Sequence, residues 1–89
     1  MSFQYKVDFT PQALEDISKL NRAVVERITN KIEWLSENLD VISPLALKGK
    51  FHDMFKLVIG DWRVIYIIDF THKIVTVHLI GHRREIYKV

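Results

Sequence analysis

The chain has 89 residues, which is enough for one domain with one core and too few for two. Hydrophobic residues make up 48% and charged residues 27%, a balance typical of a folded globular protein and not of a disordered chain. The absence of cysteine excludes disulfides and thiolate metal sites. The first residues, MSFQYKVDFTPQ, show no signal-peptide pattern, and the longest apolar stretch, VIYIID, is too short to cross a bilayer. We therefore expect a soluble, cytoplasmic protein without membrane contact.

Charge is divided unevenly along the chain. Residues 1–44 carry five Lys and Arg against seven Asp and Glu, whereas residues 45–89 carry eight against four and all four histidines. Clustered positive charge attracts phosphate at long range. The second half therefore indicates a polyanionic partner, although a random distribution of the charged residues explains the imbalance equally well.

The first half of the chain has the pattern of one strand followed by two helices. Residues 3–9, FQYKVDF, alternate apolar and polar side chains, which predicts a half-buried strand. Thr10 and Pro11 form a typical helix start, because a hydroxyl cap precedes proline at the first helical position. Apolar residues then recur at helical spacing as far as Leu39, with a break near Asn21. The pattern predicts a hairpin of two amphipathic helices.

The second half is rich in strand-forming residues. After a connector over residues 36–50, Gly60 and Asp61 separate MFKLVI from WRVIYIIDF, which predicts a β-hairpin, and KIVTVHLIG predicts a last strand. The element order predicts one α+β domain over residues 1–89: an N-terminal strand, a helical hairpin and a three-strand antiparallel meander. Because the helices are consecutive, they should pack on one face of the sheet and leave the other face open.

Side chains alternate between the two faces of a strand, so parity assigns residues to the open face. The residues expected there are Lys56 and Val58, then Arg63, Ile65 and Ile67, then Thr76, His78, Ile80 and His82. The residues expected in the core are Phe55, Leu57 and Ile59, then Val64, Tyr66 and Ile68, then Val75, Val77 and Leu79. Arg83, Arg84 and Tyr87 follow the last strand, and Lys48 and Lys50 are expected at the rim of the open face.

The expected open face carries several cations. Basic side chains on an exposed sheet often serve only to keep it soluble. Few carboxylates accompany these cations, however, since Asp69 is the only acid with the parity of Arg63. Trp62 is a candidate for stacking on a base, although an aromatic residue beside a hairpin turn more often packs inside. The histidines lack the close spacing of metal ligands, so we expect neither a metal nor another cofactor.

These residue types suit metal-free cleavage of RNA. In that reaction the 2′-hydroxyl attacks the adjacent phosphorus, and Arg63 and Arg83 can stabilise the added negative charge because guanidinium groups bind phosphate at two points. His82 and Tyr87 can carry protons, and Lys56 is the candidate base. A surface that binds RNA without cutting it would have similar residues.

The motifs LKGK, FKLVIGDWRVIYIID and VHLIGHRREIYKV resemble the RelE/ParE toxin superfamily, and in particular its RelE branch. The most specific parts are GDWRVIY and GHRR followed by Tyr87, and the resemblance covers the whole chain. It implies a type II toxin–antitoxin toxin that enters the ribosomal A site and cuts mRNA. It also implies a cognate antitoxin that wraps around the toxin, and binding of operator DNA only by the toxin–antitoxin complex.

The resemblance also implies roles for individual residues. Its implied catalytic residues are Lys56, Arg63, His82, Arg83 and Tyr87, and the candidate RNA-binding residues are Lys48, Lys50, Trp62 and Arg84. Val58 departs from the family pattern, because some members carry a second basic residue there. The ParE branch, which shares the fold but poisons DNA gyrase, is the first alternative, and a catalytically weak RNA-binding relative is the second.

Overall fold

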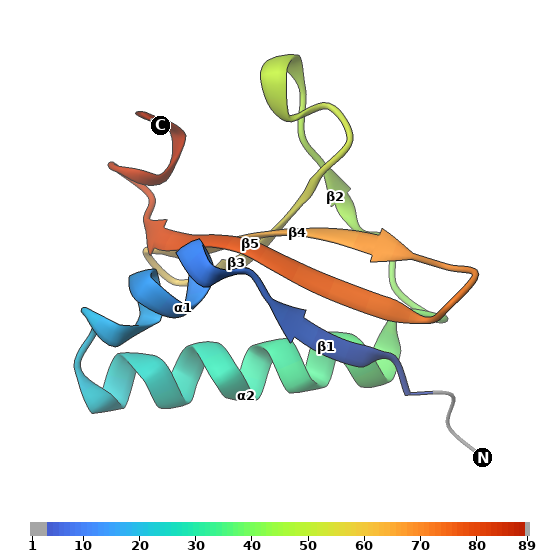
Figure 1. Ribbon diagram of the computed structural model, residues 1–89, viewed down its shortest axis with the longest axis horizontal. Helices are drawn as coiled ribbons and strands as arrows, with labels where there is room; N and C mark the ends of the chain where they lie inside the picture. Colours follow the sequence, from blue (N-terminus) through green and yellow to red (C-terminus); the bar gives the residue numbers. More distant parts are fainter. Residues whose placement is uncertain (1–3, 89) are drawn as a thin grey trace.

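The computed structural model of the chain describes residues 4–88. Its helices and strands are β1 (Lys6–Phe9), α1 (Pro11–Ser18), α2 (Arg22–Asn38), β2 (Leu45–Ala46), β3 (Phe55–Ile59), β4 (Trp62–Asp69) and β5 (Ile74–His82). Two 3-10 turns, η1 (Gly49–Phe51) and η2 (Ile86–Lys88), precede β3 and follow β5. Both helices lie on one side of the sheet, and η1 and the C-terminal segment lie on the other (Figure 1).

The five strands form one mixed sheet in the order β1-β5-β4-β3-β2. β1 runs parallel to β5, and the other pairs are antiparallel. The predicted α+β fold with its antiparallel meander is confirmed. The predicted first strand is observed over Lys6–Phe9, whereas Phe3 lies outside the described residues. The short edge strand β2 lies in the segment predicted as a connector.

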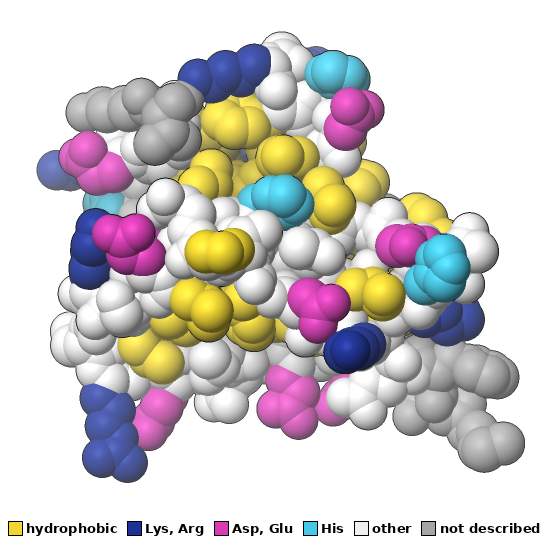
Figure 2. Space-filling view, viewed as in Figure 1, with side chains coloured by type: hydrophobic (Ala, Val, Ile, Leu, Met, Phe, Trp, Pro, Cys, Tyr) yellow, Lys and Arg dark blue, Asp and Glu magenta, His cyan; other side chains and the backbone are white. Residues whose placement is uncertain are grey.

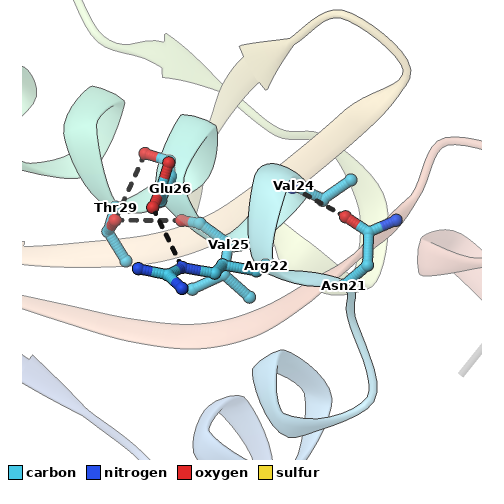
Figure 3. Close-up of polar contacts among 6 residues, drawn as sticks. All are labelled: Asn21, Arg22, Val24, Val25, Glu26 and Thr29. Carbon is cyan, nitrogen blue, oxygen red and sulfur yellow. Dashed lines mark hydrogen bonds and ion pairs between the residues drawn. The ribbon is translucent and has the colours of Figure 1, made fainter.

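Both helices begin where the sequence predicted, because side chains cap their first turns. The Ala13 amide donates to Thr10 Oγ1 at 3.1 Å, and Pro11 occupies the first helical turn. The Val24 amide donates to Asn21 Oδ1 at 3.0 Å, which separates α2 from α1 at the predicted break (Figure 3). Such caps satisfy amide groups that have no partner inside the helix.

The main core lies between the helices and one face of the sheet. Val64, Tyr66, Val75 and Val77 are almost completely buried, as predicted, and α2 covers them with a buried stripe that includes Ile28. The stripe recurs at helical spacing, which is the amphipathic pattern seen in the sequence. In the β3–β4 hairpin, Ile59 pairs with Trp62, so Gly60 and Asp61 form the predicted two-residue turn.

One irregularity in β5 reverses part of the predicted face assignment. Tyr66 pairs with Val77, whereas Ile65 pairs with Leu79, so His78 is an extra residue without a partner on β4. Such a β-bulge shifts the alternation of every later residue. Its consequence is that Leu79 and Gly81 share a face with Lys56 and Arg63.

The predictions for three residues of β5 are therefore wrong. Ile80 was expected on the open face but lies in the core at 4% exposure, opposite Val64. His82 was also expected on the open face but pairs with Trp62, whose side chain packs against the core cluster. Leu79 was expected in the core but lies opposite Ile65 on the other face.

Tyr66 gives the core a pH dependence that can be measured. Burial raises the pKa of Tyr66 to about 12, from an ordinary value of 10.0. The folded state keeps this proton where the unfolded chain loses it, so the free energy of unfolding falls as pH rises from about 10 to about 12. We expect Tyr66→Phe to lose less stability than the wild type over this interval in urea titrations. Equal losses in the two proteins would show that Tyr66 is not the group responsible.

Candidate functional site

The bulge in β5 is held by groups at the start of α1. The Thr10 amide donates to the Val77 carbonyl at 3.0 Å, and Thr10 Oγ1 donates to the His78 carbonyl at 3.1 Å. Beyond the bulge, the Ile80 amide donates to Asp16 Oδ2 at 3.0 Å, while Gln12 Nε2 donates to Asp16 Oδ1 at 2.9 Å. These bonds replace a strand ladder where β1 has ended, and they hold the backbone that leads to Gly81 and His82.

Asp16 should therefore contribute to stability through its acceptor oxygen and not through its charge. Asp16→Ala leaves the Ile80 amide without its partner, and we expect a loss of about 1–3 kcal/mol. Asp16→Asn keeps an oxygen in the same place and should lose clearly less. Urea unfolding measures both losses, and hydrogen exchange of the Ile80 amide measures local opening. Equal losses in the two variants would contradict this role.

Lys56 and Arg63 lie on the face of the sheet opposite the helices, as predicted. Lys56 pairs with Ile65, and Arg63 precedes Ile65 by two residues on β4. Diagonal neighbours of this kind lie about 7–8 Å apart, within reach of long side chains. Arg63 Nη1 donates to the carbonyls of Gly60 at 2.7 Å and Trp62 at 2.9 Å. These two bonds do not use Nε or Nη2, which leaves one edge of the guanidinium for an anion.

Arg83 is bound to the same β3–β4 turn. Its amide donates to the Asp61 carbonyl at 2.8 Å, and its Nε lies 3.4 Å from Asp61 Oδ1. Arg63 and Arg83 therefore both contact the β3–β4 turn. The sequence analysis assigned Asp61 to the hairpin turn and did not identify it as an acid beside these cations. Both side chains of the Asp61–Arg83 pair are more than half exposed, so an incoming phosphate can compete for Arg83 at little cost.

His82 lies beside Trp62 and not beside Lys56 or Arg63. The two rings meet edge to face, with centroids 5.5 Å apart. The His82 Nδ1 accepts a hydrogen bond from the Arg84 amide at 3.2 Å, so the neutral ring carries its proton on Nε2. The structure thus separates His82 and Trp62 from the other predicted site residues, and it leaves the Arg84 side chain exposed next to them.

Tyr87 lies next to η1 on the side of Lys56 and Arg63. Its ring contacts Phe51 with centroids 6.3 Å apart. A side chain at Gly81 would place Cβ 3.1 Å from the Ile86 Cδ1 atom, so glycine lets η2 rest on the sheet next to the Arg63 position. Lys48 and Lys50, at the start of η1 and within it, are exposed.

The face opposite the helices is partly covered. Ile65 is completely buried and Ile86 is 5% exposed, yet neither belongs to the main core cluster. Figure 2 shows hydrophobic side chains gathered between the sheet and the η1 lobe, with Lys and Arg mostly near the margins. η1 and η2 therefore form a second small apolar layer, which the sequence prediction of an open cationic face did not include.

The remaining histidines make local contacts or lie within the sheet. His72 Nδ1 lies 2.9 Å from Asp69 Oδ2, and the hydrogen bond from the His72 amide lowers the pKa of Asp69. His52 Nε2 lies 3.1 Å from Asp53 Oδ2. Residues 4–88 contain no cluster of three His, Cys, Asp or Glu that could hold a metal ion. No helix in that part of the chain is long and apolar enough to cross a membrane.

A family model described as ParE toxin of type II toxin-antitoxin system, parDE, matches residues 7–87. The match spans nearly the whole chain, and the chain belongs to this family of toxins, within the RelE/ParE superfamily. No curated protein matches the chain in sequence.

Solved structures of toxins share the fold. The RelBE2 toxin–antitoxin complex from Mycobacterium tuberculosis contains a chain with 25% identity and a TM-score of 0.81, over 92% of this chain and 94% of that chain. The intact Escherichia coli RelBE complex contains a chain with 25% identity and a TM-score of 0.73, over 88% of this chain and 95% of that chain. The YoeB/ParE toxin from Agrobacterium tumefaciens shows the same fold. Its identity is 18% and its TM-score 0.71, over 86% of this chain and 96% of that chain. This protein is a type II toxin with a RelE-like fold, and its structural relatives include complexes with an antitoxin.

Proposed function

We propose that this toxin is a metal-independent endoribonuclease that cuts mRNA in the ribosomal A site. We also propose that a cognate antitoxin neutralises the toxin. The observation that carries the proposal is that Arg63 and Arg83 both contact the β3–β4 turn, while Lys56 is diagonal to Arg63 on the same face. Two guanidinium groups at one turn suit a phosphodiester, whose negative charge increases during cleavage.

The reaction assigns a task to each of these groups. Lys56, acting as the neutral amine, takes the proton of the 2′-hydroxyl and becomes the ammonium ion while the 2′-oxygen bonds to the adjacent phosphorus. Arg63 and Arg83 stabilise the added negative charge, and the bond from phosphorus to the 5′-oxygen breaks. Tyr87 protonates the departing 5′-oxygen. The products are a 2′,3′-cyclic phosphate and a free 5′-hydroxyl.

The ribosome would supply orientation that the toxin lacks. The candidate groups lie on the face beside η1 and η2, where Arg83 and Tyr87 are exposed and Lys56 and Arg63 are half-buried. If the ribosome holds the mRNA in one geometry, much of the entropy cost of reaching the reactive arrangement is removed. We therefore propose that cleavage depends on the ribosome. Lys48, Lys50 and Arg84 are exposed and would contact RNA phosphates, Arg84 from the side of His82 and Trp62. We keep Trp62 as a weaker candidate for base stacking, because its ring packs against the core cluster.

Primer extension on a reporter mRNA, with and without translating ribosomes, tests the function. Because a charge-stabilising donor typically contributes 100-fold or more, we expect Arg63→Ala and Arg83→Ala each to reduce ribosome-dependent cleavage by about 100-fold. Arg22→Ala is the matched control, since the Arg22 side chain is 93% exposed on α2. Efficient cutting of free RNA by the wild type would contradict the ribosome requirement. If the wild type bound RNA without cutting it and Arg83→Ala lost only RNA affinity, the surface would be a binding module.

His82 can be tested separately from the arginines. Its position beside Trp62 and its bond to the Arg84 amide suggest that it holds the Gly81–Arg84 turn and does not carry protons. We expect His82→Asn, whose side-chain oxygen can accept the same amide hydrogen, to keep most of the cleavage activity and the wild-type pH profile. His82→Ala should lose more. A strong loss in both variants would restore His82 as a proton carrier.

Gyrase poisoning is the second candidate function. Two observations favour it: the matching family model is described as ParE, and Val58 stands where a second basic residue occurs in some RNA-cutting relatives. Induction that produced DNA breaks and left mRNA intact would establish it. The two arginines at one turn favour the ribonuclease.

A further inference from the structure

An apolar groove lies at the edge of β3, between α2 and the segment that leads into β2. Its volume is about 320 Å³. Of the seven large hydrophobic residues that are exposed in the described chain, three line this groove: Trp34 at 40%, Leu45 at 53% and Val58 at 40%. Single exposed apolar residues are ordinary, whereas three around one hollow indicate a surface that a partner covers.

The strand beside the groove is only partly paired on its outer side. β2 pairs with Phe55 and Lys56 alone, and within residues 4–88 no other strand lies along the outer side of Leu57 to Ile59. An uncovered strand edge with apolar neighbours is a site where native proteins bind a partner chain or must prevent association. Pro44 and Leu45 line the groove together with residues of α2 and β3, so a partner in the groove would contact both elements.

The charges around the groove indicate what that partner carries. Its lining includes Lys31 and Lys56 and no Asp or Glu. Lys31 Nζ lies 3.9 Å from the centre of the Trp34 ring, so the cation and the aromatic face form one unit. A partner segment that fits this groove has a large apolar side chain that fills the hollow. It also has neighbouring carboxylates that pair with Lys31 and Lys56.

We propose that this groove docks an acidic and apolar segment of the cognate antitoxin, which then covers Lys56. The antitoxin is the occupant because the chain is a type II toxin whose structural relatives include toxin–antitoxin complexes. The inhibitory consequence rests on the proposed function, in which Lys56 is the base. Val58 contributes directly to the apolar surface of the groove, because a basic residue at this position would interrupt that surface.

Affinity for the antitoxin encoded in the same operon, measured by calorimetry, tests the groove. We expect Leu45→Glu and Trp34→Ala each to weaken binding at least about 10-fold, because they add a carboxylate to the hollow or remove its aromatic face. Phe70→Glu is the control, since Phe70 is 62% exposed in the β4–β5 turn, and it should bind within about 2-fold of the wild type. Circular dichroism would verify that each variant folds, and Trp34→Ala should keep full toxicity without antitoxin.

Acetylation of lysines followed by mass spectrometry tests the covering of Lys56. Lys56 should react in the free toxin and be protected in the complex of the wild type, and protection should weaken in Leu45→Glu. Wild-type affinity of both groove variants, or Lys56 that stays reactive in the complex, would overturn the proposal. So would self-association of the wild type that Leu45→Glu abolishes, because the groove would then bind a second copy. These measurements involve no RNA, so a failure of the ribonuclease proposal would leave their outcome readable.

Discussion

The single extra residue in β5 determines how the rest of the site is arranged. His78 has no partner on β4. Each later side chain of β5 therefore lies on the face opposite to the face that simple alternation would predict. The bulge brings Gly81 opposite Arg63, and the absence of a side chain there gives η2 room to rest on the sheet, because an added Cβ would lie 3.1 Å from Ile86 Cδ1. Thr10 and Asp16 stabilise the irregular backbone, so the start of α1 and the end of β5 form one structural unit.

Local signals in the sequence were sufficient for most of the fold. The caps at Thr10 and Asn21, the helical spacing of apolar residues and the Gly60–Asp61 turn each depend on near neighbours, and each is found where it was predicted. The bulge could not be predicted in this way. No glycine or proline marks His78, and the bonds that hold it come from residues more than 60 positions away.

The same distinction applies to the site. Lys56 lies on β3 and Arg63 on β4, whereas the extra residue is on β5. Alternation therefore assigned both residues to the correct face of the sheet. His82 and Trp62 pair with each other across the shifted register, so the separation of His82 from Arg63 appears only in the structure. The bond between Arg83 and Asp61, and the contact of Tyr87 with Phe51, join segments that sequence patterns treat independently.

The chemistry of the cut RNA end tests the proposed ribonuclease most directly. Translating ribosomes would be supplied with an mRNA that carries one 2′-deoxynucleotide at the cleaved position, beside an all-ribose control. We predict that the toxin cuts the control, leaves a 2′,3′-cyclic phosphate, and does not cut the deoxy substrate. Cleavage of the deoxy mRNA, or a 5′-phosphate on the downstream product, would contradict attack by the 2′-hydroxyl.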